Sequence, residues 1–256
     1  MTDALPALPA AAMAEVDRLM LDGLGIGTLQ LMESAGHAIA AFVRESCLPG
    51  GVSGSRILAL AGSGGNGGDA LVAARWLAAW GASPTVALTK APEAYAGAAA
   101  HQLATVERMG LPILAANAGD PLPDADLILD GLLGFSATGN PRGVVATLIE
   151  AANAHPAPVL AIDLPSGLDA TSGAIGEPCI RAAWTLTLVL PKTGLLVPGA
   201  EAVCGAIAAA DIGVPAAILR RAGAAVAVSP FADSWFRPLA EGHQLRRDID
   251  GRAAGS

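Results

Sequence analysis

The chain has 256 residues, of which 53% are hydrophobic and 15% charged, and its net charge is −8 at neutral pH. Such an apolar, weakly charged sequence is not disordered, and its length suits one α/β domain with a short extension. Proteins that coat nucleic acid usually carry an excess of basic residues, so we expect no nucleic-acid partner.

Three features of the sequence predict the cellular compartment of the protein. The longest uncharged stretch, residues 76–89, has 14 residues, whereas a membrane-spanning helix needs about 20 apolar residues. Residues 1–4 lack the basic region of a signal peptide. The three cysteines are widely spaced and form no CxxC pair, which suits a reducing compartment. We therefore expect a cytoplasmic protein without a membrane partner.

Helical and strand-like segments alternate along most of the chain. Apolar periodicity predicts helices over residues 10–24, 28–46, 69–80, 93–109 and 143–154. Short apolar runs predict buried strands at 56–61, 85–89, 113–116, 127–130, 159–162 and 184–190, with weaker candidates at 206–210 and 224–228. This alternation predicts a three-layer α/β/α, Rossmann-like fold with a mostly parallel sheet. Periodicity stops at residue 229, so we assign 1–228 to one domain and 229–256 to a tail or linker remnant.

A glycine-rich segment, residues 62–68, joins the first predicted strand to a helix. Backbone N–H groups at such a junction can hold a phosphate. The spacing fits G-x-G-x-x-G, but Thr89 stands where a dinucleotide-binding fold carries its ribose-binding acid, and no Gly-Lys-Ser/Thr completes a P-loop. Asn66 and Asp69 add polar side chains to this loop, which favours contact with a ligand or an ion over a plain tight turn.

Polar residues also follow other predicted strands. Asp130 and Asp163 each end a strand, and Ser166 follows shortly after. The two lysines of the chain, Lys90 and Lys192, come directly after further strands. Because the carboxyl ends of parallel strands meet at one edge of a sheet, we expect a ligand crevice there.

These segments, in this order, resemble the NAD(P)H-hydrate epimerase family, also described as the YjeF N-terminal domain. The resemblance spans residues 10–228 and is carried by residues 31–36, 65–75, 130–134, 161–169 and 185–195. It implies an isomerase that interconverts the R and S forms of hydrated NADH and NADPH, which is a repair of damaged nicotinamide nucleotides. It also implies one K⁺ per subunit and a homodimer.

The resemblance further implies roles for particular residues. Asp163 would contact the substrate, and Asp163 and Lys90 are the two catalytic candidates. Asp163 would act as the acid–base group, and Lys90 would neutralise the phosphates or stabilise Asp163. Asn66, Asp130 and Ser166 match positions that bind potassium. The substrate-binding set comprises Asp163 and two loops: Gly65, Asn66, Gly67, Gly68 and Asp69, and Gly134, Phe135, Ser136, Ala137, Thr138, Gly139 and Asn140.

The sequence departs from the family pattern in the glycine-rich loop, and two of the other possible functions are disfavoured by missing motifs. Gly65 replaces the first Asn of the family's N-N-G-G-D motif, which removes one polar contact. The alternative function is a non-catalytic nucleotide- or protein-binding module of the same fold, which would be expected to lose the strand-end acids. An NAD-dependent oxidoreductase is disfavoured by the missing ribose-binding acid, and a metal hydrolase by the isolated histidines.

Overall fold

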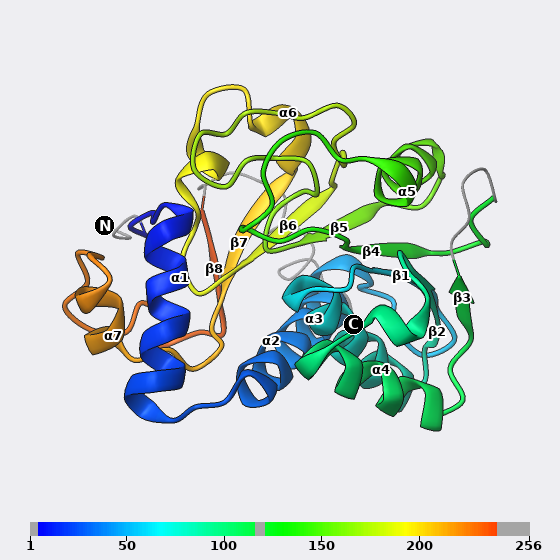
Figure 1. Ribbon diagram of the computed structural model, residues 1–256, viewed down its shortest axis with the longest axis horizontal. Helices are drawn as coiled ribbons and strands as arrows, with labels where there is room; N and C mark the ends of the chain where they lie inside the picture. The colour runs from blue at the N-terminus through cyan, green and yellow to red at the C-terminus, as the bar shows by residue number, and fades with distance from the viewer. Residues whose placement is uncertain (1–4, 116–120, 240–256) are drawn as a thin grey trace, which may run out of the picture.

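The computed structural model describes residues 5–115 and 121–239. Within these residues, eight strands form one sheet in the order β3-β2-β1-β4-β5-β6-β7-β8 (Figure 1), and every pair is parallel except β7 with β8. The strands are β1 (Arg56–Ala61), β2 (Ser83–Leu88), β3 (Ile113–Ala115), β4 (Leu127–Gly131), β5 (Val159–Ile162), β6 (Trp184–Leu188), β7 (Ala206–Ala210) and β8 (Phe236–Pro238).

Helices cover both faces of this sheet (Figure 1), which confirms the predicted three-layer α/β/α fold. The α-helices are α1 (Ala10–Arg18), α2 (Thr28–Phe42), α3 (Gly65–Ala79), α4 (Gly97–Arg108), α5 (Gly143–Ala154), α6 (Glu201–Cys204) and α7 (Ala216–Arg221). Two π-helical segments, η1 (Leu19–Gly23) and η2 (Val43–Cys47), continue α1 and α2. No helix among the described residues is long and apolar enough to cross a membrane.

The alternation of side chains along β1 explains how the two layers form. Ile57 and Ala59 belong to the core shared with α2, α3 and α4, whereas Leu58 and Leu60 belong to the core shared with α5. Successive residues of a strand point to opposite faces, so an uninterrupted apolar run is what a strand covered on both sides requires.

Helices α2 and α3 pack with their backbones close together at Gly36. A Cβ atom at this position would lie 2.3 Å from the Val72 side chain, so a larger residue would force the two helices apart. Their close packing places the first turn of α3 beside the carboxyl ends of the strands, where the candidate site lies.

The structure corrects several predicted elements. Helix α3 begins at Gly65 rather than near Asp69, so Asn66 lies on its first turn and Asp69 at the start of its second turn. The segment predicted as one helix over 93–109 is a short turn, η3 (Pro92–Ala94), followed by α4. Residues 224–228 form no strand, because Ala224 N donates to Leu219 O (2.9 Å) at the end of α7.

Part of the predicted C-terminal tail belongs to the sheet. Phe236–Pro238 forms β8 against β7, and the Phe236 ring packs on Phe42 with 5.4 Å between ring centroids. This strand is only three residues long, which is too short for a periodicity to reveal it in the sequence. The remainder of the predicted tail, residues 240–256, lies outside the described residues.

Candidate functional site

A cavity of about 650 Å³ opens at the carboxyl ends of the central strands. The chain runs from β1 outward to β2 and β3 and then returns to β4 on the other side of β1, so the strand order reverses between β1 and β4. Ligands of open α/β folds bind at such a reversal. The loop after β1 (Gly62, Ser63, Gly64, Gly65) and the loop after β4 (Leu132, Leu133, Gly134, Phe135, Ser136, Ala137) both line the cavity.

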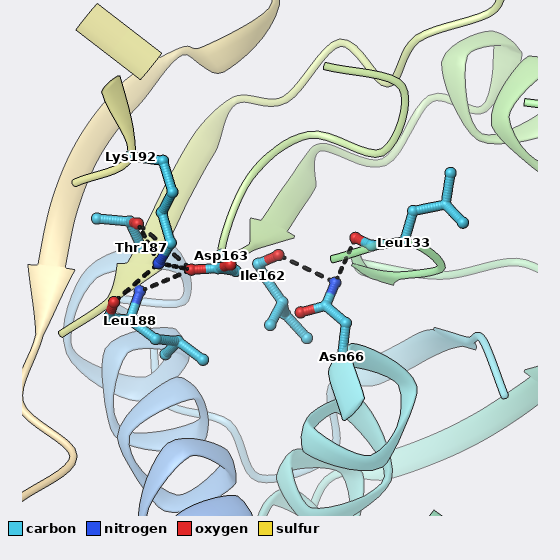
Figure 2. Close-up of polar contacts among 7 residues, drawn as sticks. All are labelled: Asn66, Leu133, Ile162, Asp163, Thr187, Leu188 and Lys192. Carbon is cyan, nitrogen blue, oxygen red and sulfur yellow. Dashed lines mark hydrogen bonds and ion pairs between the residues drawn. The ribbon is translucent and has the colours of Figure 1, made fainter. Parts of the chain in front are cut away.

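Asp163 and Lys192 form a buried ion pair in the wall of this cavity. Their side chains are 5% and 1% exposed, respectively. Asp163 Oδ1 accepts hydrogen bonds from Lys192 Nζ, from Leu188 N (3.1 Å) and from the Thr187 hydroxyl (3.4 Å), as Figure 2 shows. Lys192 Nζ also donates to Leu188 O (2.9 Å) and to Thr187 Oγ1 (3.2 Å). The arrangement fixes the position of the Asp163 side chain at the edge of the sheet.

The backbone at this pair is strained. Asp163 has φ +69° and Val189 has φ +68°, the two left-handed residues other than glycine in the described part of the chain. Aspartate tolerates this conformation better than most residues, but a β-branched valine does not, and each such residue costs on the order of 1–3 kcal/mol. Both residues line the cavity, at the ends of the neighbouring strands β5 and β6. Strain concentrated at a cavity wall is typical of a functional site.

Lys90 does not pair with Asp163, contrary to one of its two expected roles. Lys90 is exposed at the cavity and forms no salt bridge in the described structure, whereas Lys192 is the cation that stabilises Asp163. The expectation that Lys90 neutralises substrate phosphates stays a prediction. In the sequence, Lys192 is marked only by its place directly after a predicted strand, and this place does not predict its pairing with Asp163.

Asp130, Ser166 and Asn66 gather around the backbone of Leu133. Asp130 is fully buried and accepts hydrogen bonds from Ser166 Oγ (2.6 Å), Ser166 N (2.8 Å) and Leu132 N (3.2 Å). Ser166 Oγ accepts a hydrogen bond from Leu133 N (2.9 Å), and Asn66 Nδ2 donates to Leu133 O (2.8 Å) and Ile162 O (3.1 Å; Figure 2). Burial raises the pKa of Asp130 to about 6, although the hydrogen bonds from Ser166 and from Leu132 N oppose this effect.

Two further carboxyl groups, Asp17 and Asp69, line the same cavity and are each partly buried. Burial is the main cause that raises the pKa of Asp69 well above its usual value, with the negative charges of Asp163 and Asp17 adding to it. Burial also raises the pKa of Asp17, although Lys192 opposes this effect. Asp69 was predicted as part of the site, whereas Asp17 was missed. The signal for Asp17 was an acid on the apolar face of its helix, four residues after Met13 and three before Met20.

The other predicted substrate-binding residues are divided between three locations. Gly65, Asn66 and Asp69 line the cavity, as do Gly134, Phe135, Ser136 and Ala137. Gly139 and Asn140 line a neighbouring cavity of about 120 Å³, and Asn140 Oδ1 accepts a hydrogen bond from Glu177 N (3.2 Å). Gly67, Gly68 and Thr138 line neither cavity. Gly67 is required by packing, since a Cβ atom there would lie 1.7 Å from Gly62 O.

Comparison with known proteins identifies the family. The family model described as YjeF-related protein N-terminus matches residues 28–194, which include the glycine-rich loop, the strand-end acids and Lys192. The chain belongs to this family. A solved structure, that of the yeast protein YNL200c, superposes with a TM-score of 0.77 and 26% sequence identity, over 92% of this chain and all of that chain.

Curated members of the YjeF-related family are similar over most of this chain. An NAD(P)H-hydrate epimerase from Dehalogenimonas lykanthroporepellens is 35% identical over 94% of this chain and 96% of its own length. A bifunctional NAD(P)H-hydrate repair enzyme, Nnr, from Moorella thermoacetica is 38% identical over 80% of this chain. The match covers 40% of the length of that bifunctional protein. The chain therefore corresponds to one part of the longer relative and to nearly the full length of the shorter one.

Proposed function

We propose that this protein is an NAD(P)H-hydrate epimerase, which interconverts the R and S forms of hydrated NADH and NADPH. The observation that carries the proposal is the buried Asp163–Lys192 pair in a cavity at the strand-order reversal, within the segment that matches the family. Nothing in the structure or the comparisons favours a non-catalytic binding module, and the strand-end acids that such a module would be expected to lose are present.

The reaction needs two changes at C6 of the hydrated nicotinamide ring, which carries a hydroxyl next to the ring nitrogen. The nitrogen lone pair forms a C=N bond while the C6–O bond breaks, and the leaving oxygen takes a proton and departs as water. Water then adds to the planar C6 from the other face, and the proton returns to the protein. No electron is transferred, so the nicotinamide is neither oxidised nor reduced.

Asp163 is suited to face the positive charge that develops on the ring. A carboxylate held by Lys192, Thr187 and Leu188 N keeps its position and cannot rotate away during the reaction. A positioned acid–base group contributes about 10²–10⁴-fold in rate. The free N–H groups at the start of α3 and the exposed Lys90 would hold the pyrophosphate of the substrate.

A potassium ion at Asn66, Asp130 and Ser166 is part of the proposal, and the residues fit such an ion. Asp130 is a fully buried carboxylate without a cationic hydrogen-bond partner. Leu133 O lies 2.8 Å from Asn66 Nδ2 and 3.5 Å from Ser166 Oγ, so oxygen donors gather at one point once the Asn66 amide is turned over. Hard cations prefer oxygen ligands. Bound there, the ion would neutralise Asp130 and fix the loop after β4.

The proposed ion is monovalent because the resemblance to the family implies potassium, and the donors at the site are one carboxylate and neutral oxygens. A cytoplasmic location and a homodimer also remain proposals, which rest on the resemblance to the family.

The test is the stereochemical fate of hydrated NADPH. A sample enriched in one epimer is incubated with and without the protein, and the two epimers are separated by liquid chromatography over time. We expect the protein to accelerate equilibration while the total of hydrated NADPH stays constant. Asp163→Asn should lower kcat by about 10²–10⁴-fold, counted per folded molecule. Equal rates with and without the protein would refute the proposed function.

A further inference from the structure

Helix α1 places Asp17 at the cavity, and the backbone before α1 is hydrogen-bonded to the residues on both sides of Lys192. Leu8 N donates to Pro191 O (2.9 Å) and Thr193 N donates to Leu8 O (3.0 Å), so Leu8 pairs with the backbone on both sides of Lys192. Met13 and Val16 of α1 are buried in the core that this segment shares with α7. Figure 1 shows α1 beside α7 at the edge of the molecule where β7 and β8 lie. Asp17 is therefore held in place by packing.

Carboxyl groups outnumber the available cations in this cavity. Among the described residues, five charged or titratable side chains line it, each from a different element: Asp17 on α1, Asp69 on α3, Lys90 after β2, Asp163 after β5 and Lys192 after β6. Lys192 is committed to Asp163, and Lys90 is exposed. Among the described residues, neither Asp17 nor Asp69 forms a hydrogen bond or an ion pair through its side chain.

Such a group of acids retains a proton. Burial and the charges of Asp163 and Asp17 raise the pKa of Asp69 well above its usual value, and burial raises that of Asp17. By contrast, Asp163 Oδ1 accepts three hydrogen bonds, one of them from the Lys192 ammonium group, which hold the carboxyl group in place. The cavity therefore holds one acid fixed by hydrogen bonds, Asp163, and one without such partners whose raised pKa favours a bound proton, Asp69.

Epimerisation requires proton transfer on both faces of C6, because water leaves from one face and adds to the other. We propose that Asp69 and Asp163 each serve one face of C6, and that Asp17 is a positioning residue that keeps the proton on Asp69. This inference rests on the proposed function. When one epimer reacts, Asp69 gives its proton to the C6 hydroxyl, the C6–O bond breaks and water departs. When water adds from the other face, Asp163 takes the proton that this water loses, and exchange through the water in the cavity returns it to Asp69.

A measurement of oxygen exchange distinguishes a catalytic role of Asp69 on one face of C6 from a purely structural role of Asp69. The epimerisation rate and the incorporation of ¹⁸O from labelled water into the C6 hydroxyl are measured on the same samples. A variant in which only one of the two acids acts still removes the C6 hydroxyl as water and adds water back on the same face. This exchanges the oxygen without inverting the configuration at C6. We expect Asp69→Asn to slow epimerisation by about 10²–10⁴-fold, while oxygen exchange into one epimer falls by less than tenfold. Parallel loss of both rates, or no loss of either, would overturn the proposal.

Asp17 is tested through the pH profile. Asp69 must be protonated to act, so kcat falls as pH rises through the pKa of Asp69. Asp17→Asn removes a negative charge that raises this pKa, so the fall should move to lower pH, and Asp17→Glu should restore it. Glu15→Gln on the same helix is the matched control, because Glu15 pairs with Arg18 at the surface. An unchanged profile in Asp17→Asn would overturn the role of Asp17.

The activity of the wild-type protein distinguishes a failure of this proposal from a failure of the proposed function. If wild-type protein does not accelerate epimerisation, the proposed function fails. If it does, and Asp69→Asn is as active as wild type, only the role of Asp69 fails. Both asparagine variants are isosteric and remove a partly buried acid whose side chain has no hydrogen-bond partner in the described part of the chain, so we expect them to melt within a few degrees of wild type.

Discussion

Lys192→Met should destabilise the protein strongly, because it leaves the Asp163 carboxylate buried without its cation. The two side chains are 1% and 5% exposed, so water cannot replace the lost partner. Breaking such a pair from one side costs about 3–5 kcal/mol in the free energy of unfolding. At roughly 2–4 °C per kcal/mol for a domain of this size, the melting temperature should fall by about 10 °C.

A double-mutant cycle measures whether the pair acts as a unit. Asp163→Asn leaves Lys192 buried with only neutral acceptors, Thr187 Oγ1 and Leu188 O, so it should cost a similar amount. The variant with both substitutions contains no buried charge at this site. We expect it to lose at least 2 kcal/mol less than the sum of the single variants, as measured by urea unfolding at pH 7.5.

The control for the cycle is Lys90→Met, which removes the other lysine of the chain. Lys90 is exposed and has no salt bridge among the described residues, so its loss should change stability by less than about 0.5 kcal/mol. If the losses from Lys192→Met and Asp163→Asn simply add in the double variant, within about 0.5 kcal/mol, then the two groups are not coupled and the reasoning is wrong.

Three further predictions concern the phosphates, the cation and the glycine-rich loop. Lys90→Met should raise KM for hydrated NADPH about tenfold without changing kcat, since a charge-assisted contact to phosphate contributes about 1.5–3 kcal/mol; an unchanged KM would remove Lys90 from the site. The pKa of Asp130 is raised to about 6, so the stability that this carboxyl contributes is complete below its ordinary pKa of 3.8 and is lost as pH rises through 6. Potassium should therefore raise the melting temperature more at pH 8 than at pH 5.5, relative to choline chloride at equal ionic strength, and equal shifts would argue against the cation site. Gly67→Ala should lower the free energy of unfolding by about 3 kcal/mol because its Cβ would clash with Gly62 O, whereas Gly65→Asn, which has no atom within 4 Å of its Cβ, should be tolerated and should lower KM.

The sequence predicts an element well where its boundaries are chemically marked. Strands β5 and β7 have the predicted bounds, because Pro158 precedes the apolar run of β5 and Gly205 precedes that of β7. The start of α3 was predicted four residues late, because glycines at 65, 67 and 68 have poor helix propensity. In the structure, contacts with the sheet and with Met32 make this glycine-rich turn helical, and single-residue propensity does not include these contacts.

The candidate site shows a different limit of sequence-based prediction. The rule that parallel strands end at one edge was enough to bring Asp163, Asp130 and both lysines to one side of the sheet. It could not decide which lysine meets Asp163, because that choice depends on the order of the strands. Lys192 follows β6, the neighbour of β5, whereas Lys90 follows β2, which is separated from β5 by β1 and β4. Strand order depends on packing between distant segments, and no local pattern in the sequence encodes it.

The hydrogen bonds between the N-terminal segment and the backbone around Lys192 determine where a fragment with a complete cavity must begin. The family match starts at residue 28, after α1 and η1 have ended. Yet Met13, Asp17 and Leu21 form part of the cavity wall, and Leu8 pairs with the backbone around Lys192. A fragment cut at the edge of the match would keep every matched residue and still open the cavity to bulk water on one side. The family model therefore defines a shorter unit than the cavity does, and expression designs should take their start from the cavity.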